Sequence, residues 1–229
     1  MAVLIQKLHP ALRVGLQPVL AASGLRLFSR QGHWDRGSTL HCVAMALALL
    51  GRLSDPVDVR LDGQDSWFWD CAWPHYLHGL TLSELVSFIW ELNAGVRPVA
   101  AHGNSTTVLR FCTQELARGS PVIVCWHAPD QTCHTGLVTG TEGRQDRRTY
   151  VPHTLLLLDP AETEPQLAAY NARLEAGKRR RALQVTTRMT QEVVLADAVS
   201  IRLLKLPEPA ALDLGRRRRI GPALTGRRE

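Results

Sequence analysis

Cys42, His134 and Asp159 lie far apart in the sequence, and their side chains together could perform nucleophilic catalysis. A cysteine attacks a carbonyl carbon as the thiolate, so it needs an imidazole to take its proton and a third group to orient that imidazole. Cys42 falls near the start of the uncharged segment 39–50, which predicts a buried helix closed by Gly51. A helix start stabilises a thiolate through the helix dipole and unpaired N–H groups. We therefore predict that Cys42, in the first turn, is the nucleophile.

The predicted base and its orienting acid belong to strand-like segments. His134 opens the segment 134–140, whose apolar and β-branched residues predict a strand. Asp159 follows a run of leucines and precedes a proline, which restricts the aspartate to an extended conformation and ends a second strand. A carboxylate there could reach the ring nitrogen of His134 that does not face Cys42. Gln31, upstream of the helix, could help to hold an oxyanion together with the backbone N–H of Cys42.

The order Gln, Cys, His, Asp resembles the papain-like family of bacteriocin-processing, double-glycine leader peptidases and its stand-alone relatives. The family pattern is a glutamine, a gap, and a cysteine that begins a helix with an Ala-Met-x-Leu core. The segments that carry the resemblance are His-Cys-Val-Ala-Met-Ala-Leu at 41–47, Gly-Ser-Pro-Val-Ile-Val at 119–124, His-Thr-Gly-Leu-Val-Thr-Gly at 134–140 and Leu-Leu-Asp-Pro at 157–160. The resemblance spans about residues 30 to 160, and Val43 stands where many members have glycine. It implies a papain-like fold, no metal or other cofactor, and hydrolysis of a peptide or related amide through a thioester.

Several alternatives remain open at this point. The same fold could be a binding module without activity, or an acyltransferase in which an amine replaces water. Other histidines could act as the base: His33, His41, His127 and His153. Two clusters have ligand-like spacing for zinc, although neither repeats a Cys-x-x-Cys pair: Cys71, His75 and His78, and Cys125, His127 and Cys133. The aromatic residues Trp69, Trp73 and Tyr76 predict a loop that flanks a cleft.

The elements that would position these residues form an α+β arrangement, with a helical N-terminal half and a C-terminal antiparallel sheet. Helices are predicted at 39–50, 81–94 and 105–118, with Ser38 or Thr39 as the first N-cap, and helix-forming composition returns at 162–181. Strands are predicted at 121–126, 134–141, 154–158, 192–195 and 199–204, and a loop at 61–78. We expect an N-terminal extension (1–30), one peptidase domain (31–206) and a poorly ordered basic tail (207–229).

Composition narrows the class of protein. The 229 residues are 45% hydrophobic and 21% charged, as in an ordinary globular protein. Five cysteines suit reduced thiols in the cytoplasm, and we find neither a signal-peptide pattern nor an apolar run long enough to cross a bilayer. The net charge of +6 is concentrated in the basic runs 178–181, 216–219 and 227–228. The charge pattern therefore argues against a nucleic acid as the main partner, we expect no membrane partner, and the family resemblance implies a peptide or protein substrate.

Overall fold

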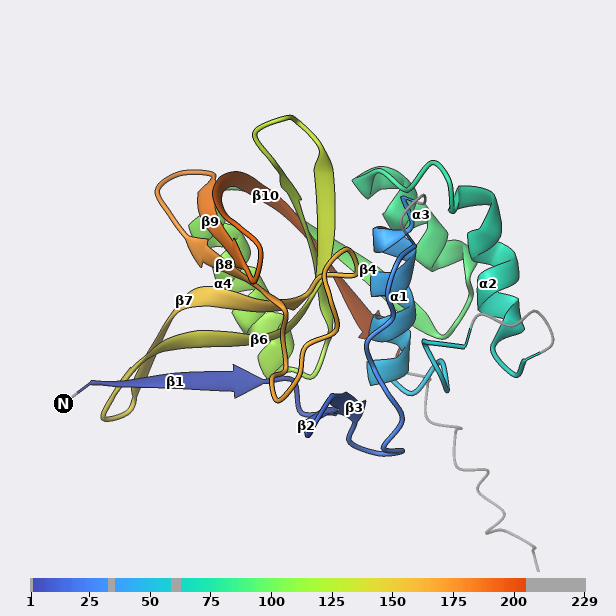
Figure 1. Ribbon diagram of the computed structural model, residues 1–229, viewed down its shortest axis with the longest axis horizontal. Helices are drawn as coiled ribbons and strands as arrows, with labels where there is room; N and C mark the ends of the chain where they lie inside the picture. The colour runs from blue at the N-terminus through green and yellow to red at the C-terminus, as the bar shows by residue number, and fades with distance from the viewer. Residues whose placement is uncertain (1, 33–35, 59–62, 205–229) are drawn as a thin grey trace, which may run out of the picture.

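The computed structural model describes residues 2–32, 36–58 and 63–204. Three helices gather on one side of a large antiparallel sheet, and a fourth helix packs on the other side (Figure 1). This arrangement confirms the predicted α+β class. The predicted basic tail at 207–229 lies outside the described residues.

Helix α1 (Ser38–Leu49) is the centre of the helical side and is buried along almost its whole length. It has no charged residue, and Gly51 follows it with a φ of 66°, a left-handed conformation that glycine adopts without strain. Its N-cap is Gly37, which has no side chain to cap the helix, and not Ser38 or Thr39. Helix α3 (Leu82–Glu91) begins with the predicted capping box, in which Thr81 and Glu84 bond each other's backbone N–H groups.

The sheet closes on itself through six strands, each antiparallel to its neighbours. These are β5 (Val122–His127), β6 (Cys133–Asp146), β7 (Thr149–Leu158), β8 (Ala172–Ala176), β9 (Arg181–Thr186) and β10 (Thr190–Leu203). The ring runs β6-β5-β10-β9-β8-β7 and returns to β6. Strand β4 (Val96–His102) adds to β10, and strand β1 (Val3–Leu8) adds to β6 beyond the end of β5. A short hairpin, β2 (Leu12–Val14) with β3 (Pro18–Leu20), follows β1.

The two faces of the sheet belong to different cores. Ile123 and Leu137 point toward α1 and the neighbouring helices. Val124, Trp126 and Val138 point to the opposite face, where helix α4 (Ser105–Ala117) fills the hollow of the curved sheet. Successive side chains of a strand alternate between the two faces. The side of the sheet on which a residue of β5 or β6 lies therefore decides whether it can reach α1.

Several sequence predictions differ from the structure. The predicted extension 1–30 contains β1, whose six residues pair with β6, so this segment is part of the sheet. The predicted loop 61–78 contains helix α2 (Ser66–Ala72) and the 3-10 helix η1 (Trp73–His75), because buried Phe68 and Trp69 dock against the core. The segment 162–181, predicted from its composition to be helical, contains strand β8 and no helix. Tertiary pairing with β7 and β9 outweighs the local propensity there. None of the described helices is long and apolar enough to span a membrane.

Candidate functional site

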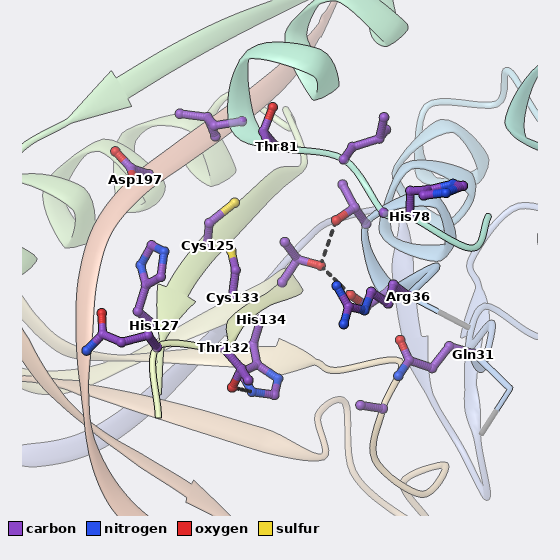
Figure 2. A pocket seen from close by; sticks show the side chains of 18 of the residues that line it. Gln31, Arg36, His78, Thr81, Cys125, His127, Thr132, Cys133, His134 and Asp197 are labelled. Atoms are coloured by element: carbon purple, nitrogen blue, oxygen red, sulfur yellow. Dashed lines mark hydrogen bonds between the residues drawn. The ribbon is translucent and has the colours of Figure 1, made fainter. Parts of the chain in front are cut away.

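A pocket of about 670 Å³ lies where the first turn of α1 meets the turn end of the β5–β6 hairpin (Figure 2). The segment 78–82, which leads into α3, forms the opposite wall. Polar side chains with amide, guanidinium, hydroxyl, imidazole, thiol and carboxyl groups line the pocket: Gln31, Arg36, Ser38, Thr39, His78, Thr81, Cys125, His127, Asp130, Thr132, Cys133, His134, Thr135 and Asp197. A cavity of this size and mixed lining is typical of a site for a small molecule or part of a peptide.

Thr135 is the hub of a cluster of hydroxyl groups at the floor of this pocket. Its hydroxyl donates to Ser38 Oγ at 3.0 Å, and its Oγ1 lies 3.2 Å from Thr39 Oγ1. Ser38 and Thr39 are the first two residues of α1, so the cluster joins the start of the helix to β6. No imidazole among the described residues is hydrogen-bonded to Ser38. Within the described part of the chain, the Ser38 hydroxyl therefore has a neighbouring hydroxyl, and not a base, as its hydrogen-bond partner.

Cys42 lies one residue further into the helix than predicted. The helix begins at Ser38, so Cys42 is its fifth residue and not part of the first turn. The side chain is fully buried, and it is not among the residues that line the pocket. Burial raises the pKa of the Cys42 thiol well above its usual value, and the nearby Asp159 carboxyl raises it further. Hydrogen bonds from the Thr135 side chain and the Leu137 backbone only partly offset this. The thiol is held in its neutral, unreactive form.

His134 faces away from Cys42. It pairs with Trp126 across β5 and β6, and its ring stacks on the Trp126 ring with centroids 5.9 Å apart and planes at 15°. Trp126 belongs to the core around α4, whereas Cys42 belongs to the core around α1, on the other face of the sheet. His134 Nε2 lies 3.0 Å from Thr132 Oγ1. Partial burial lowers the pKa of His134, and the Asp130 carboxylate opposes this effect.

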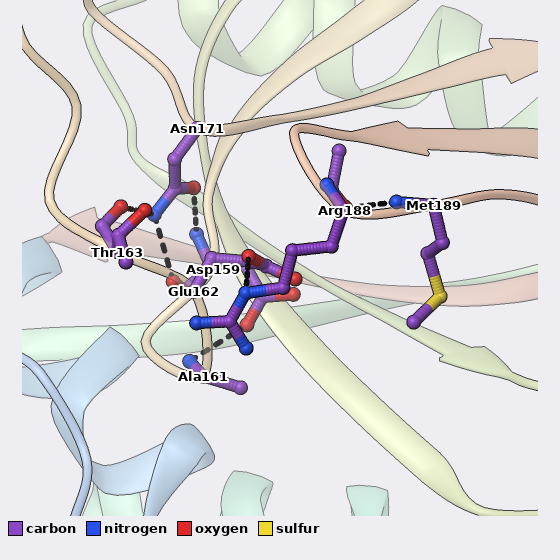
Figure 3. Close-up of polar contacts among 8 residues, drawn as sticks. Asp159, Ala161, Glu162, Thr163, Asn171, Arg188 and Met189 are labelled. Atoms are coloured by element: carbon purple, nitrogen blue, oxygen red, sulfur yellow. Dashed lines mark hydrogen bonds and ion pairs between the residues drawn. The ribbon is translucent and has the colours of Figure 1, made fainter.

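Asp159 lies near Cys42, whereas the predicted triad places it beside the His134 ring, and its carboxyl bonds a backbone N–H (Figure 3). Its Oδ1 accepts a hydrogen bond from the Ala161 N–H at 2.9 Å. Asn171 bonds the Asp159 backbone from both sides, accepting from its N–H at 2.7 Å and donating to its carbonyl at 2.9 Å. Burial raises the pKa of Asp159 to about 7, although the Ala161 bond lowers it. Asp159 thus holds the turn that ends β7, and it is not hydrogen-bonded to His134.

Gln31 lines the same pocket as Ser38, whereas Cys42 does not line the pocket. Its backbone N–H donates to the Pro160 carbonyl at 3.1 Å, which ties the segment before α1 to the turn after Asp159. Its Oε1 is buried, and no donor among the described residues bonds it. The structure therefore brings Gln31, the helix start and His134 to one pocket, and it brings Asp159 close to Cys42, which lies on the other face of the sheet from the His134 ring.

The rival histidines have separate surroundings. His41 is buried, with Nδ1 2.8 Å from Ser29 Oγ and Nε2 3.1 Å from the Tyr76 hydroxyl. His127 lines the pocket on the same face as Thr135. His153 Nδ1 contacts Thr154 Oγ1 on β7, and His33 lies outside the described residues.

The proposed zinc clusters do not form sites of three or more ligands. Over residues 2–32, 36–58 and 63–204, no group of three or more histidine, cysteine or acidic side chains is arranged to hold a metal ion. All five cysteines are free thiols. The predicted aromatic loop divides into buried Trp69, which packs on His41, and an exposed stack of Trp73 on Tyr76 beside the segment that walls the pocket.

Sequence reasoning missed Ser38, Thr39 and Thr135 as pocket residues. Two signals could have found them. Alternation along 134–140 puts Thr135 and Leu137 on one face and His134 on the other. The family pattern also places its key residue at the start of the helix. Predicting Ser38 as the first helical residue would therefore have identified Ser38 as a pocket residue.

The sequence matches none of the protein-family models with which it was compared. No curated protein matches it significantly either.

Proposed function

We propose that this chain has a papain-like fold whose pocket binds a peptide without hydrolysing it. One observation carries the proposal: the pocket meets α1 at Ser38, while the Cys42 thiol lies one turn further along the helix with no exposed surface. A substrate carbonyl held in the pocket would meet hydroxyl groups and not a thiol. This supports a binding module over the peptidase that the sequence predicts.

The helix start gives independent support. In the family that the sequence resembles, a cysteine begins the helix, and here the first helical residue is Ser38. A hydroxyl needs a strong base to become a nucleophile, and the group that faces Ser38 across the pocket floor is the Thr135 hydroxyl. A threonine cannot act as the base at neutral pH. The Ser38 and Thr135 hydroxyls can therefore bind a ligand by hydrogen bonds, but neither is activated to attack a carbonyl carbon.

A peptide fits the pocket better than an apolar ligand does. The floor offers the hydroxyls of Ser38, Thr39 and Thr135, which both donate and accept hydrogen bonds as a peptide backbone requires. The rim carries Arg36 on the helix side and Asp130 on the sheet side, so charges of either sign find a partner. The volume of about 670 Å³ accommodates a few residues of an extended chain.

The binding test uses a phage-displayed library of random peptides, followed by fluorescence polarisation with the selected sequences. We expect the wild-type protein to retain peptides and to release them intact after prolonged incubation, as measured by mass spectrometry. Ser38→Trp, which fills the pocket, should weaken binding at least tenfold. Ser87→Trp, exposed on α3 and outside the pocket, is the matched control and should bind as the wild type does. Selection of no peptide above background would overturn the proposal.

Hydrolysis is tested on the same peptides. If wild-type protein cleaves them and Cys42→Ala does not, the chain is a thiol hydrolase and the proposal is wrong. A second measurement tests the geometry directly. Ser38→Cys places a thiol in the pocket at the start of a helix, where alkylation by iodoacetamide should be rapid, whereas Cys42 in the same chain should stay unmodified. Faster alkylation of Cys42 than of the introduced thiol would contradict the arrangement.

A further inference from the structure

Cys125 and Cys133 place two thiols next to each other at the sheet end of the pocket. The register of β5 and β6 pairs Cys125 with Thr135 and His127 with Cys133, so all four side chains point to the same face. Both cysteines line the pocket, and their side chains project from the adjoining strands in Figure 2. Cys133 is exposed, while Cys125 is 7% exposed. A small solute in the pocket therefore reaches Cys133 directly and meets Cys125 at the pocket wall.

The separation of the two cysteines suits a bridging atom better than a direct bond. They are diagonal neighbours in the ladder, for which Cα atoms lie about 7–8 Å apart. A disulfide requires Cα atoms about 4.4–6.8 Å apart, so direct oxidation of the pair would require backbone movement. Two sulfur–metal bonds of about 2.3 Å each extend the reach of the two side chains and close this difference. The strands can thus keep their register with one ion between the sulfurs.

We propose that Cys125 and Cys133 form a binding site for one thiophilic metal ion of low coordination number, of which Cu(I) is the representative. Soft thiolate ligands select Cu(I), and a monovalent d¹⁰ ion is satisfied by two sulfurs in line. Each thiol gives its proton to solvent as its sulfur–metal bond forms, and the oxidation state of the ion does not change. The site is distinct from the hydroxyl floor on which the proposed peptide binding depends.

The surroundings favour two ligands over four. Asp197 on β10 pairs with Cys125 and also lines the pocket, but its Oδ1 already bonds His102 Nδ1 at 2.7 Å. His127 stands opposite Cys133, and the cluster does not form a group of three or more ligands among the described residues. Zinc, which takes four ligands in a structural site, therefore finds too few here. A linear ion needs only the two thiolates.

The test is an anaerobic titration of the full chain with Cu(I) in competition with a chromophoric Cu(I) chelator. We expect one ion per chain, with thiolate-to-copper charge-transfer absorption in the ultraviolet. Cys133→Ser and Cys125→Ser should each weaken binding at least 100-fold. Cys71→Ser removes an exposed thiol on α2, away from the pocket, and is the matched control that should leave affinity unchanged. Equal loss in Cys71→Ser, or full affinity in Cys133→Ser, would overturn the assignment.

Further measurements separate this site from a folding effect and from zinc. Cys133 is exposed, so Cys133→Ser should keep the wild-type circular dichroism spectrum and urea midpoint, and its loss of Cu(I) then reports the ligand alone. His127→Ala should bind Cu(I) within threefold of wild type. If His127→Ala loses Cu(I) as strongly as the cysteine variants do, or if the chain binds Zn(II) alone with one ion per chain and tetrahedral Co(II) spectra, the two-thiolate assignment is wrong.

Discussion

Replacing Asp159 by asparagine should make the protein more stable at alkaline pH and remove a large part of its pH dependence. Asp159 is 3% exposed, and burial raises its pKa to about 7 from an ordinary value of 3.8. The native state therefore keeps this proton between about pH 4 and pH 7, where the unfolded chain has lost it. Stability falls as pH rises wherever the native state holds more protons. The proton on Asp159 therefore contributes fully to the free energy of unfolding below the pKa of the unfolded chain, and this contribution is lost as pH rises through the native pKa.

The magnitude follows from the two pKa values. A difference of about three pH units corresponds to about 4 kcal/mol in the free energy of unfolding. Asparagine keeps an Oδ1 that can accept the Ala161 N–H bond, and it carries no charge to desolvate. The Asp159→Asn variant should match wild type near pH 4 and exceed it by about 4 kcal/mol at pH 8 and above.

Urea unfolding followed by tryptophan fluorescence, repeated from pH 4 to pH 9, measures this difference by linear extrapolation. Asp70→Asn, which removes an exposed carboxylate on α2, is the control and should run parallel to wild type across the whole range. If Asp159→Asn also runs parallel to wild type, the carboxyl is not desolvated in the native state and the reasoning from burial fails. A gain that is the same at pH 4 and pH 8 would likewise refute it.

Three other perturbations test the fold around the site. Brief iodoacetamide treatment followed by mass mapping should modify exposed Cys71 well before buried Cys42, and rapid loss of the Cys42 thiol would contradict its burial. Gly140→Ala places a methyl group 2.6 Å from a backbone oxygen of β1, so hydrogen exchange should show that β1 detaches from β6 while α1 stays protected. Glu115→Ala removes a buried carboxylate that bonds two arginines and a serine and should cost about 3 kcal/mol in thermal or urea unfolding, whereas a loss below about 0.5 kcal/mol would show that the network adds little.

Local patterns in the sequence were sufficient for many elements. The capping box at Thr81 predicted the start of α3, and the structure confirms it. The uncharged run before Gly51 predicted α1, and the β-branched runs predicted β5, β6 and β7. These signals are short-range, because they depend on hydrogen bonds within a turn or on the spacing of apolar residues along one segment.

Elements that depend on distant partners escaped the same reasoning. Strand β1 has exposed side chains on both faces, so its pattern gives no sign of a sheet, and only its pairing with β6 makes it a strand. Strand β8 has helix-forming composition and is extended because β7 and β9 lie on either side of it. Local propensity amounts to tenths of a kcal/mol per residue, which a ladder of hydrogen bonds and a buried face easily exceed.

The sequence by itself determined the α+β class, the buried helix that contains Cys42, and the acidic turn at Asp159. Of the residues for which it predicted catalytic roles, Gln31 and His134 line the pocket. Tertiary structure alone decided which side chains meet. The helix starts one residue earlier than predicted, its first residue Ser38 lines the pocket while Cys42 lies in the core, and the alternation of β6 turns Thr135 toward α1 and His134 away from it. A shift of one residue turns a side chain by about 100° on a helix and to the opposite face on a strand, because faces repeat every 3.6 and every two residues, so a small error in register decides which group lines the pocket.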